Sequence, residues 1–320
     1  MQYVDDEIWI DKVELKDEWE KVLGGIDGPA NRPVKQLCNR TAWLKRLIQP
    51  FIKMITPVGG GQPYPVMDLR IPIYEDVTLQ VSTSGDDETG DLTHPFATPQ
   101  AAIDYALSAF DFKKQVALTI EVAQGQYGRL EFRPPPSGIK WIIIEGENNG
   151  NTFFSNVVSH ANCEITLRKI GLNGIAQDLH NSQIIAFTGA SILLDTVSFF
   201  PYPDIGVNPI IAMNGGFIQA LNTNLFFNNA AAFNSFFDAE TNGIINISNT
   251  ILYVNQYVYV NTGIAIVVNG GSFTAINTQT SEIVNGVNYY AVSGGRIITL
   301  GAIGNWGTVA GYNDGTAIIQ

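Results

Sequence analysis

Five stretches of the chain decide its fold, because they can be stacked on one another: EITLRKIGL (164–172), SILLDTVSF (191–199), FIQALNTNLFF (217–227), IINISNTILYV (244–254) and SFTAINTQTSEI (272–283). Stacked in this way, they share one column, at spacings of 27, 27, 27 and 28 residues, whose members are Arg168, Asp195, Asn222, Asn249 and Asn277. Turns that contain glycine precede most of these stretches. A constant period in the twenties, with strand-like units and Asn/Gly turns, is typical of a solenoid.

About 27 residues suffice for one coil of three short strands and three turns, and no coil can bury its apolar face alone. Asn in a fixed column suits a left-handed backbone position, and stacked Asn amides can bond to one another along the axis. We therefore predict a mainly β protein, a right-handed parallel β-helix over residues 81–320. The spaced leucines of leucine-rich repeats are absent, and a β-sandwich remains an alternative that would not explain the regular spacing.

Residues 1–60 have a different, helical character and predict an N-terminal attachment segment. Residues 13–23 form one amphipathic pattern that ends at Gly24-Gly25. Apolar positions then recur in steps of three and four at Val34, Leu37, Thr41, Leu44, Ile48, Phe51 and Ile55. This spacing fits a short coiled coil, or equally an amphipathic helix packed on the first one. Residues 61–80 read as a linker, since turn formers replace the periodicity.

A single helix is expected at the start of the repeat region, at about 98–110. Thr98 followed by Pro99 is an N-cap and first-turn pair, and PQAAIDYALSAF supplies about three turns. The strands VALTIEV (116–122) and WIIIE (141–145) follow. WIIIE does not alternate, which indicates a strand buried on both sides.

The composition excludes several classes of partner. The net charge of −12 argues against a nucleic-acid groove and against an electrostatic hold on acidic membranes. No stretch approaches the roughly 18 apolar residues of a membrane span. Cys38 and Cys163 fall in different predicted domains, so a disulfide framework is not expected and assembly in the bacterial cytoplasm is the simplest expectation.

Two segments carry a resemblance to a known family. GDDETGDLTHPFATPQAAIDYAL…VALTIEVAQGQYG, between residues 85 and 127, looks like the opening of pectate-lyase-like phage tailspikes and tail fibres. In that family a polar loop and a PFAT-Q-AID helix cap the β-helix, and a strand ending in G-x-Y starts the first coil. DGPANRPVKQLCNRTAWLKRLI (27–48) resembles the attachment segment of tail-fibre proteins. Together the two matches cover about a fifth of the chain.

The resemblance implies a homotrimer in the virion tail, bound to other tail or baseplate proteins through its N-terminus. The attachment residues that it implies are Asn31, Arg32, Leu37, Arg40, Trp43 and Leu44. It also implies contact with host cell-surface polysaccharide, which some relatives cleave. Cleaving members carry a longer β-helix and a separate C-terminal domain, whereas here the strand pattern runs nearly to residue 320.

Residue types limit the chemistry of a cleaving site. No Lys or Arg occurs between Ile170 and Gly295, so the repeats lack the base that a polysaccharide lyase uses. Hydrolysis needs two carboxylates, and Asp238 with Glu240 would share one face of a strand. Asp178 lies two residues before His180, and Asp195 and Asp204 bracket the aromatic loop SFFPYPD. Each also has a structural interpretation as a turn or column residue.

No metal site or cofactor is expected. The histidines His94, His160 and His180 share no ligand spacing. DDETGD (86–91) has oxygen ligands that suit calcium, but it lacks the pattern of a known calcium loop. A polar capping loop is the preferred interpretation.

Aromatic residues are too numerous for the narrow bore of a single coil, and an extended Phe-Phe pair directs one ring outward. The set consists of Phe199, Phe200, Tyr202, Phe226, Phe227, Phe233, Phe236, Phe237, Tyr253, Tyr257, Tyr259, Tyr289 and Tyr290. Exposed apolar area on this scale predicts an interface, through trimer contacts in preference to sugar stacking. The positions selected for this role are Phe200, Tyr202, Phe227, Phe237, Tyr257 and Tyr289.

These observations predict a phage tail fibre or tailspike protein that contributes to adsorption on host-surface glycan. Binding without catalysis is preferred. One alternative is a capsule or O-antigen depolymerase acting as a glycoside hydrolase. A second is a structural adaptor that carries another receptor-binding protein.

Overall fold

The computed structural model describes residues 70–135, 138–160, 162–175, 181–200, 207–228, 232–254, 258–282, 284–300 and 307–320. The chain divides into two units between Leu69 and Arg70, and every described residue belongs to the second. The helical attachment segment predicted for residues 1–60 therefore lies outside the described residues.

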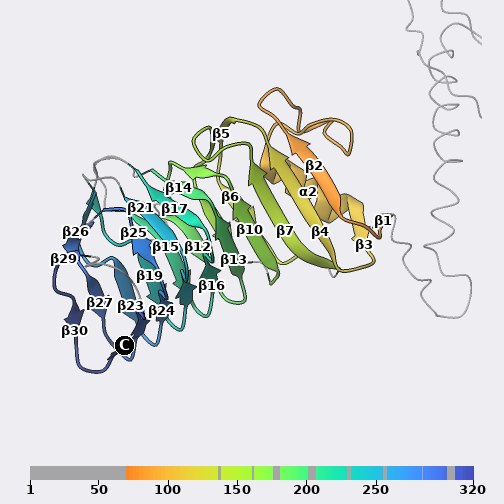
Figure 1. Ribbon diagram of the computed structural model, residues 1–320. Coiled ribbons are helices and arrows are strands. Elements are labelled where there is room, and N and C mark those ends of the chain that lie inside the picture. Colours follow the sequence, from red (N-terminus) through yellow and green to blue (C-terminus); the bar gives the residue numbers. More distant parts are fainter. Residues whose placement is uncertain are drawn as a thin grey trace, which may run out of the picture. The chain divides into compact units, whose positions relative to one another are not determined.

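The described unit is mainly β, with few helices, and forms a parallel β-solenoid of about six coils. Strands of successive coils lie side by side in chain order, as Figure 1 shows for β2, β4, β7 and β10. The prediction of a parallel β-solenoid is confirmed. Its right-handed sense and its trimeric state stay predictions.

Three long parallel sheets form the sides of the solenoid. Sheet 1 has ten strands, which pair in the order β2 (Val77–Val81), β4 (Val116–Val122), β7 (Ile139–Gly146), β10 (Glu164–Arg168), β13 (Ser191–Asp195), β16 (Phe217–Gln219), β20 (Ile244–Asn246), β24 (Ser272–Thr274), β28 (Arg296–Ile298) and β31 (Ile318–Ile319). Sheet 2 has seven, β5 (Gly125–Tyr127), β8 (Thr152–Phe154), β11 (Gly171–Leu172), β14 (Val197–Phe199), β17 (Asn224–Phe227), β21 (Ile251–Val254) and β25 (Gln279–Thr280). Sheet 3 has eight, β6 (Leu130–Phe132), β9 (Val157–Ser159), β12 (Ser182–Ala186), β15 (Asn208–Met213), β19 (Phe237–Glu240), β23 (Ala265–Val268), β27 (Tyr289–Ala291) and β30 (Tyr312–Asn313).

Two smaller sheets complete the described unit. A fourth sheet of four strands consists of β18 (Ala232–Phe233), β22 (Tyr259–Val260), β26 (Val284–Val287) and β29 (Gly307–Val309). Along the chain, its strands lie between those of sheets 2 and 3 in the later coils. A two-stranded sheet joins β1 (Ile71–Ile73) to β3 (Phe110–Phe112) near the start of the unit.

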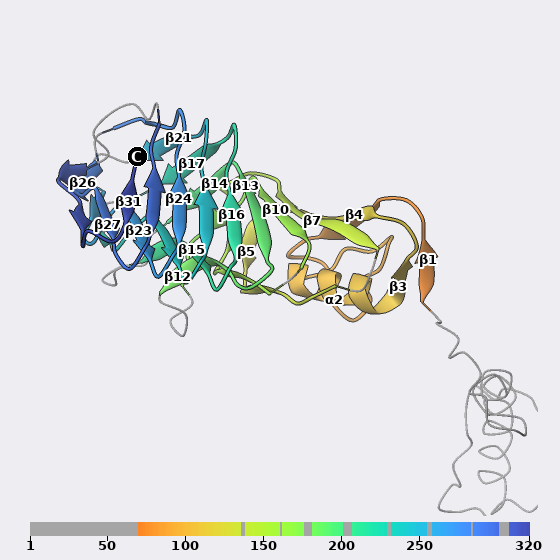
Figure 2. The ribbon, with the colours of Figure 1, turned by 90° about the horizontal axis from the view of Figure 1, so that it is seen from below.

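The predicted helix is present as α2 (Pro99–Ala109), beside the first strands of the solenoid (Figure 2). The Thr98 hydroxyl accepts a hydrogen bond from the Ala101 N–H at 3.3 Å, as an N-cap does. Asp87 in turn accepts bonds from the backbone N–H and the hydroxyl of Thr98, both at 2.8 Å. Among the described residues no helix is long and apolar enough to cross a membrane.

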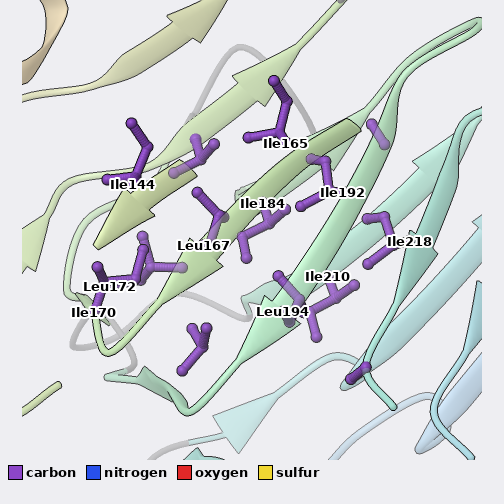
Figure 3. Packing of buried hydrophobic residues seen from close by; sticks show 14 of the residues in the cluster. Ile144, Ile165, Leu167, Ile170, Leu172, Ile184, Ile192, Leu194, Ile210 and Ile218 are labelled. Carbon is purple, nitrogen blue, oxygen red and sulfur yellow. The ribbon is translucent and has the colours of Figure 1, made fainter. Parts of the chain in front are cut away.

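The core consists of apolar side chains that repeat at the same position in successive coils. On sheet 1, Ile165, Ile192 and Ile218 pair strand to strand and are all buried (Figure 3). Ile184 and Ile210 do the same on sheet 3, from the opposite side of the same core. Stacking equal side chains fills the bore evenly, so each coil covers the apolar face of its neighbour.

In five successive coils a residue with a left-handed backbone follows the strand of sheet 1. In the first two of these coils it lies one position after the residue that the sequence predicts. Positive φ angles of 51–60° occur at Lys169, Thr196, Asn222, Asn249 and Asn277. The three asparagines confirm the prediction. Arg168 and Asp195 were wrongly placed in that column, because they are strand residues that pair directly with each other.

Amide stacking along the axis occurs as expected between two of these asparagines. The side-chain N–H of Asn277 donates to the side-chain oxygen of Asn249 at 3.3 Å, across one coil. Both residues keep the left-handed backbone, with φ of 51° and 53°. Asn tolerates this conformation better than other residues with a side chain, which explains its repeated use at this corner.

A second corner needs glycine because the preceding coil lies too close for a Cβ atom. A Cβ on Gly243 would lie 1.9 Å from the Ala212 carbonyl oxygen, and one on Gly216 would lie 2.1 Å from that of Ala186. The obstacle is paired backbone, which cannot move away without opening the sheet. Gly271 repeats the same contact one coil later, at 2.0 Å from the Ala239 oxygen.

Gly243→Ala should therefore destabilise the protein by about 1–3 kcal/mol or more, because the methyl group overlaps the neighbouring coil. Gly128→Ala is the matched control, since a Cβ there meets nothing within 4 Å. Urea unfolding followed by circular dichroism measures both variants. Equal stability of Gly243→Ala and the control would contradict the close-packed corner.

Candidate functional site

Asp238 and Glu240 lie on the same face of β19, as the sequence predicts. Phe237 and Ala239 point into the core, so the two carboxyl groups point to the other face of sheet 3. Asp238 pairs with Ile211 on β15 and Ile266 on β23. An acidic side chain thus lies between two isoleucines in the register of sheet 3.

Asp238 is buried, with 3% of its surface exposed. Burial, followed by the charge of Glu240 and a hydrogen bond between the two carboxyl groups, raises the pKa of Asp238 to about 8. No donor group in the described part of the chain reaches its Oδ1 atom. Asp238 therefore keeps its proton at neutral pH, as a buried carboxyl group beside a like charge does.

This contact differs from the arrangement used for glycoside hydrolysis. Retaining enzymes hold their carboxyl groups about 5 Å apart and inverting enzymes about 6.5–9.5 Å apart, with sugar or water between them. Carboxyl groups joined by a hydrogen bond approach to about 3 Å and leave no such space. Burial of Asp238 also separates it from solvent. The pair is suited to hold a proton within the sheet.

Asp195 belongs to a polar ladder on the outer face of sheet 1. The ladder runs across successive strands from Gln80 through Glu121, Glu145 and Arg168 to Asp195. Arg168 bridges two coils, with Nε at 3.0 Å from Asp195 Oδ2 and a terminal nitrogen at 3.3 Å from Glu145 Oε2. The hydroxyl groups of neighbouring threonines also donate to Asp195. Asp195 is thus engaged in holding coils together.

A hollow of about 390 Å³ lies beside the first strands of this ladder. Glu121, Glu145, Glu147 and Lys169 are among its lining residues. The Lys169 ammonium lies 2.8 Å from Glu145 Oε1. This hydrogen bond and the charges of Lys169 and Arg168 hold the pKa of Glu145 below its usual value. Lys169 is therefore paired with the Glu145 carboxylate.

The acidic loop of residues 86–91 uses its carboxylates on its own backbone. Asp86 accepts from the Glu88 N–H at 2.9 Å, and Asp91 accepts from the Thr93 and His94 N–H groups at 2.7 and 2.8 Å. These bonds lower the pKa of both aspartates. The contacts fit the capping interpretation. Within the described ranges, no three His, Cys, Asp or Glu side chains gather as a metal site.

The prediction that an adjacent aromatic pair directs one ring outward is wrong for Phe236 and Phe237, and in the pair Phe226-Phe227 the outward ring is Phe226, not the selected Phe227. Phe227 and Phe237 are fully buried in the core, where the Phe227 ring stacks on Phe236 at 4.0 Å. The N–H groups of Phe236 and Phe237 both donate to the Ile264 carbonyl oxygen. This bulge-like pairing breaks the alternation of the strand, so both adjacent rings enter the core.

Other aromatic rings do reach the surface. Phe200 and Tyr289 are half-buried, as is Phe226, whereas Tyr253 is 40% exposed. Phe226 and Tyr253 belong to the wider aromatic set but not to the six selected positions. The alternation in NLFF and ILYV, with Phe227 and Val254 inward, could have identified them.

Several predicted site residues lie outside the described residues. They are the candidate acids and histidine Asp178, His180 and Asp204, the aromatics Tyr202 and Tyr257, and the attachment residues Asn31, Arg32, Leu37, Arg40, Trp43 and Leu44. Their roles stay predictions.

No family model, curated protein or solved structure matches the chain. We therefore argue function from the arrangement of the residues themselves.

Asp238→Asn should remove a pH dependence of stability. The folded-state pKa of Asp238, about 8, lies above the ordinary aspartate value of 3.8, so its contribution to stability is present below about pH 4 and is lost as pH rises through about 8. Asparagine has no carboxyl group to titrate, so the variant does not lose stability in this way. Its stability relative to wild type should therefore rise by on the order of 4 kcal/mol between pH 4 and pH 9.

Urea unfolding midpoints at a series of pH values measure this effect. Glu282→Gln removes an exposed carboxylate and serves as the control, with a pH profile parallel to wild type. A parallel profile for Asp238→Asn would show that the buried pair is not protonated as inferred.

Proposed function

We propose that the protein is a tail fibre or tailspike of a bacteriophage or prophage, which adsorbs to polysaccharide on the host surface. Parallel β-solenoids are common in tailspikes and in polysaccharide-binding or depolymerising proteins. The resemblance of residues 85–127 to the capped opening of phage spikes supports the same assignment. On this proposal residues 1–60 attach the chain to the tail or baseplate of the virion.

The observation that carries adsorption is the outer face of sheet 2, which presents exposed aromatic rings in successive coils. Phe226 and Tyr253 are neighbours in register, and their rings stack at 4.9 Å. An exposed aromatic surface beside a few polar groups is the usual composition of a small-ligand site. Sugar rings present such an apolar face together with hydroxyl groups.

Binding is favoured over cleavage by the geometry of the best carboxyl pair. Asp238 and Glu240 touch each other, and Asp238 is buried. The hydrolase remains the alternative that a direct assay decides. The adaptor alternative predicts neither binding nor cleavage.

A homotrimer is supported by the outer face of sheet 1. It exposes Ile244 at 43%, and Phe217 lies half-buried beside it on the neighbouring strand. Neighbouring apolar side chains on an exposed sheet face form a patch of the kind that marks an interface in a soluble protein. We propose that copies of the chain pack through this face.

Adsorption is tested by incubating the purified full-length protein with host capsule and lipopolysaccharide, following both binding and released reducing ends. We expect binding without release. Release would instead establish the depolymerase, and the absence of both signals would establish the adaptor. Heat-unfolded protein is the control for nonspecific binding.

Ile244→Asp should weaken the trimer, because each copy then buries a carboxylate in the apolar face. Sedimentation equilibrium should show a wild-type trimer and a shift of the variant toward monomer by at least about tenfold in dissociation constant. Gln279→Asp adds the same charge to sheet 2 and should leave the trimer intact. A wild-type monomer would refute this assembly.

A further inference from the structure

The stacked pair Phe226–Tyr253 forms an aromatic surface that is longer than one ring. Phe226 on β17 pairs with Tyr253 on β21, and the ring planes differ by 9°. The residues that follow them, Phe227 and Val254, point into the core, which fixes both rings on the outer face. Two parallel rings, stacked on each other across adjacent strands of a rigid sheet, are already in position before a ligand arrives.

Amide groups flank this surface. Asn224 precedes Phe226 by two residues and therefore shares its face of sheet 2. Asn224 is level with Ile251 and Gln279 on the next two strands, and Gln279 is exposed. A carboxamide both donates and accepts hydrogen bonds, so it suits a hydroxyl group of a sugar.

The same face is uncharged over its described length from β14 to β25. Its outward positions hold Ser198, Asn224, Phe226, Ile251, Tyr253 and Gln279. The sequence contains no Lys or Arg between Ile170 and Gly295, and the chain has a net charge of −12. An acidic glycan would meet no cation here and would be repelled by the protein as a whole.

We infer that the outer face of sheet 2 around Phe226 and Tyr253 binds an uncharged oligosaccharide. Sugar rings pack against the exposed edges of the two stacked aromatic rings, and their hydroxyl groups bond to the amides of Asn224 and Gln279. This inference rests on the proposed adsorption function and adds to it the site and the class of glycan.

The experiment uses the full-length protein and an array of purified polysaccharides. The neutral set consists of glucans, mannans, galactans and N-acetylhexosamine polymers, and the acidic set of polyuronates and polysialate. We expect binding within the neutral set, and the tightest neutral polymer is then titrated by calorimetry. Preference for an acidic polymer would overturn the inference.

Three variants locate the site on the protein. Tyr253→Ala should weaken binding at least about tenfold, because it removes the exposed ring, and Tyr253→Phe should change it less than about threefold. Tyr259→Ala removes a comparably exposed tyrosine, 47% against 40%, from the fourth sheet and should bind as wild type. Unchanged binding by Tyr253→Ala would overturn the inference while leaving adsorption itself intact.

A second measurement does not depend on the folding of a variant. Hydroxyl-radical footprinting of the wild-type protein should show that the neutral polymer protects Phe226 and Tyr253 and leaves Tyr259 unprotected. Protection elsewhere would place the site on another face. Failure of the wild-type protein to bind host glycan of any kind would reject the proposed function as well.

Discussion

Parallel backbone pairing between successive coils is the constraint on which the rest of the structure depends. A single coil cannot bury its own apolar side chains, so each coil must hydrogen-bond to the next in a fixed register. From β10 to β24 that register returns each position to the same place after 26 to 28 residues. The left-handed corner at Asn222, Asn249 and Asn277 and the glycine corner at Gly216 and Gly243 are both consequences of it.

The sequence was sufficient to predict the features that this period controls. The strand stacking, the left-handed asparagines and the helix behind Thr98 all follow from local chemistry repeated at a constant interval. The alignment failed by one residue at Arg168 and Asp195, because β13 and β16 pair so that Leu193 is level with Gln219. A 26-residue step, from Thr196 to Asn222, therefore replaces the expected 27.

The aromatic residues were harder to place, for a reason that lies in the cross-section of the coils. The sequence predicts a narrow bore, whereas a fourth sheet begins at β18 in the later coils. The core of these coils accommodates Phe227, Phe233, Phe236 and Phe237 together. The burial of Asp238 could not be predicted from the sequence either. The alternation of a strand shows that Asp238 shares a face with Glu240, but it does not show that this face is covered.

The division of surface chemistry between sheets follows from the same stacking. A side chain that points outward in one coil lies about 4.8 Å from its equivalent in the next, so one apolar position repeated along a sheet becomes a continuous surface. On sheet 1 this repetition places the half-buried Phe217 beside the exposed Ile244, which favours protein contact. On sheet 2 it brings Phe226 and Tyr253 into ring contact beside amides, which favours a ligand that has both an apolar face and hydroxyl groups. A solenoid can therefore assemble through one side and bind through another without any change in its core.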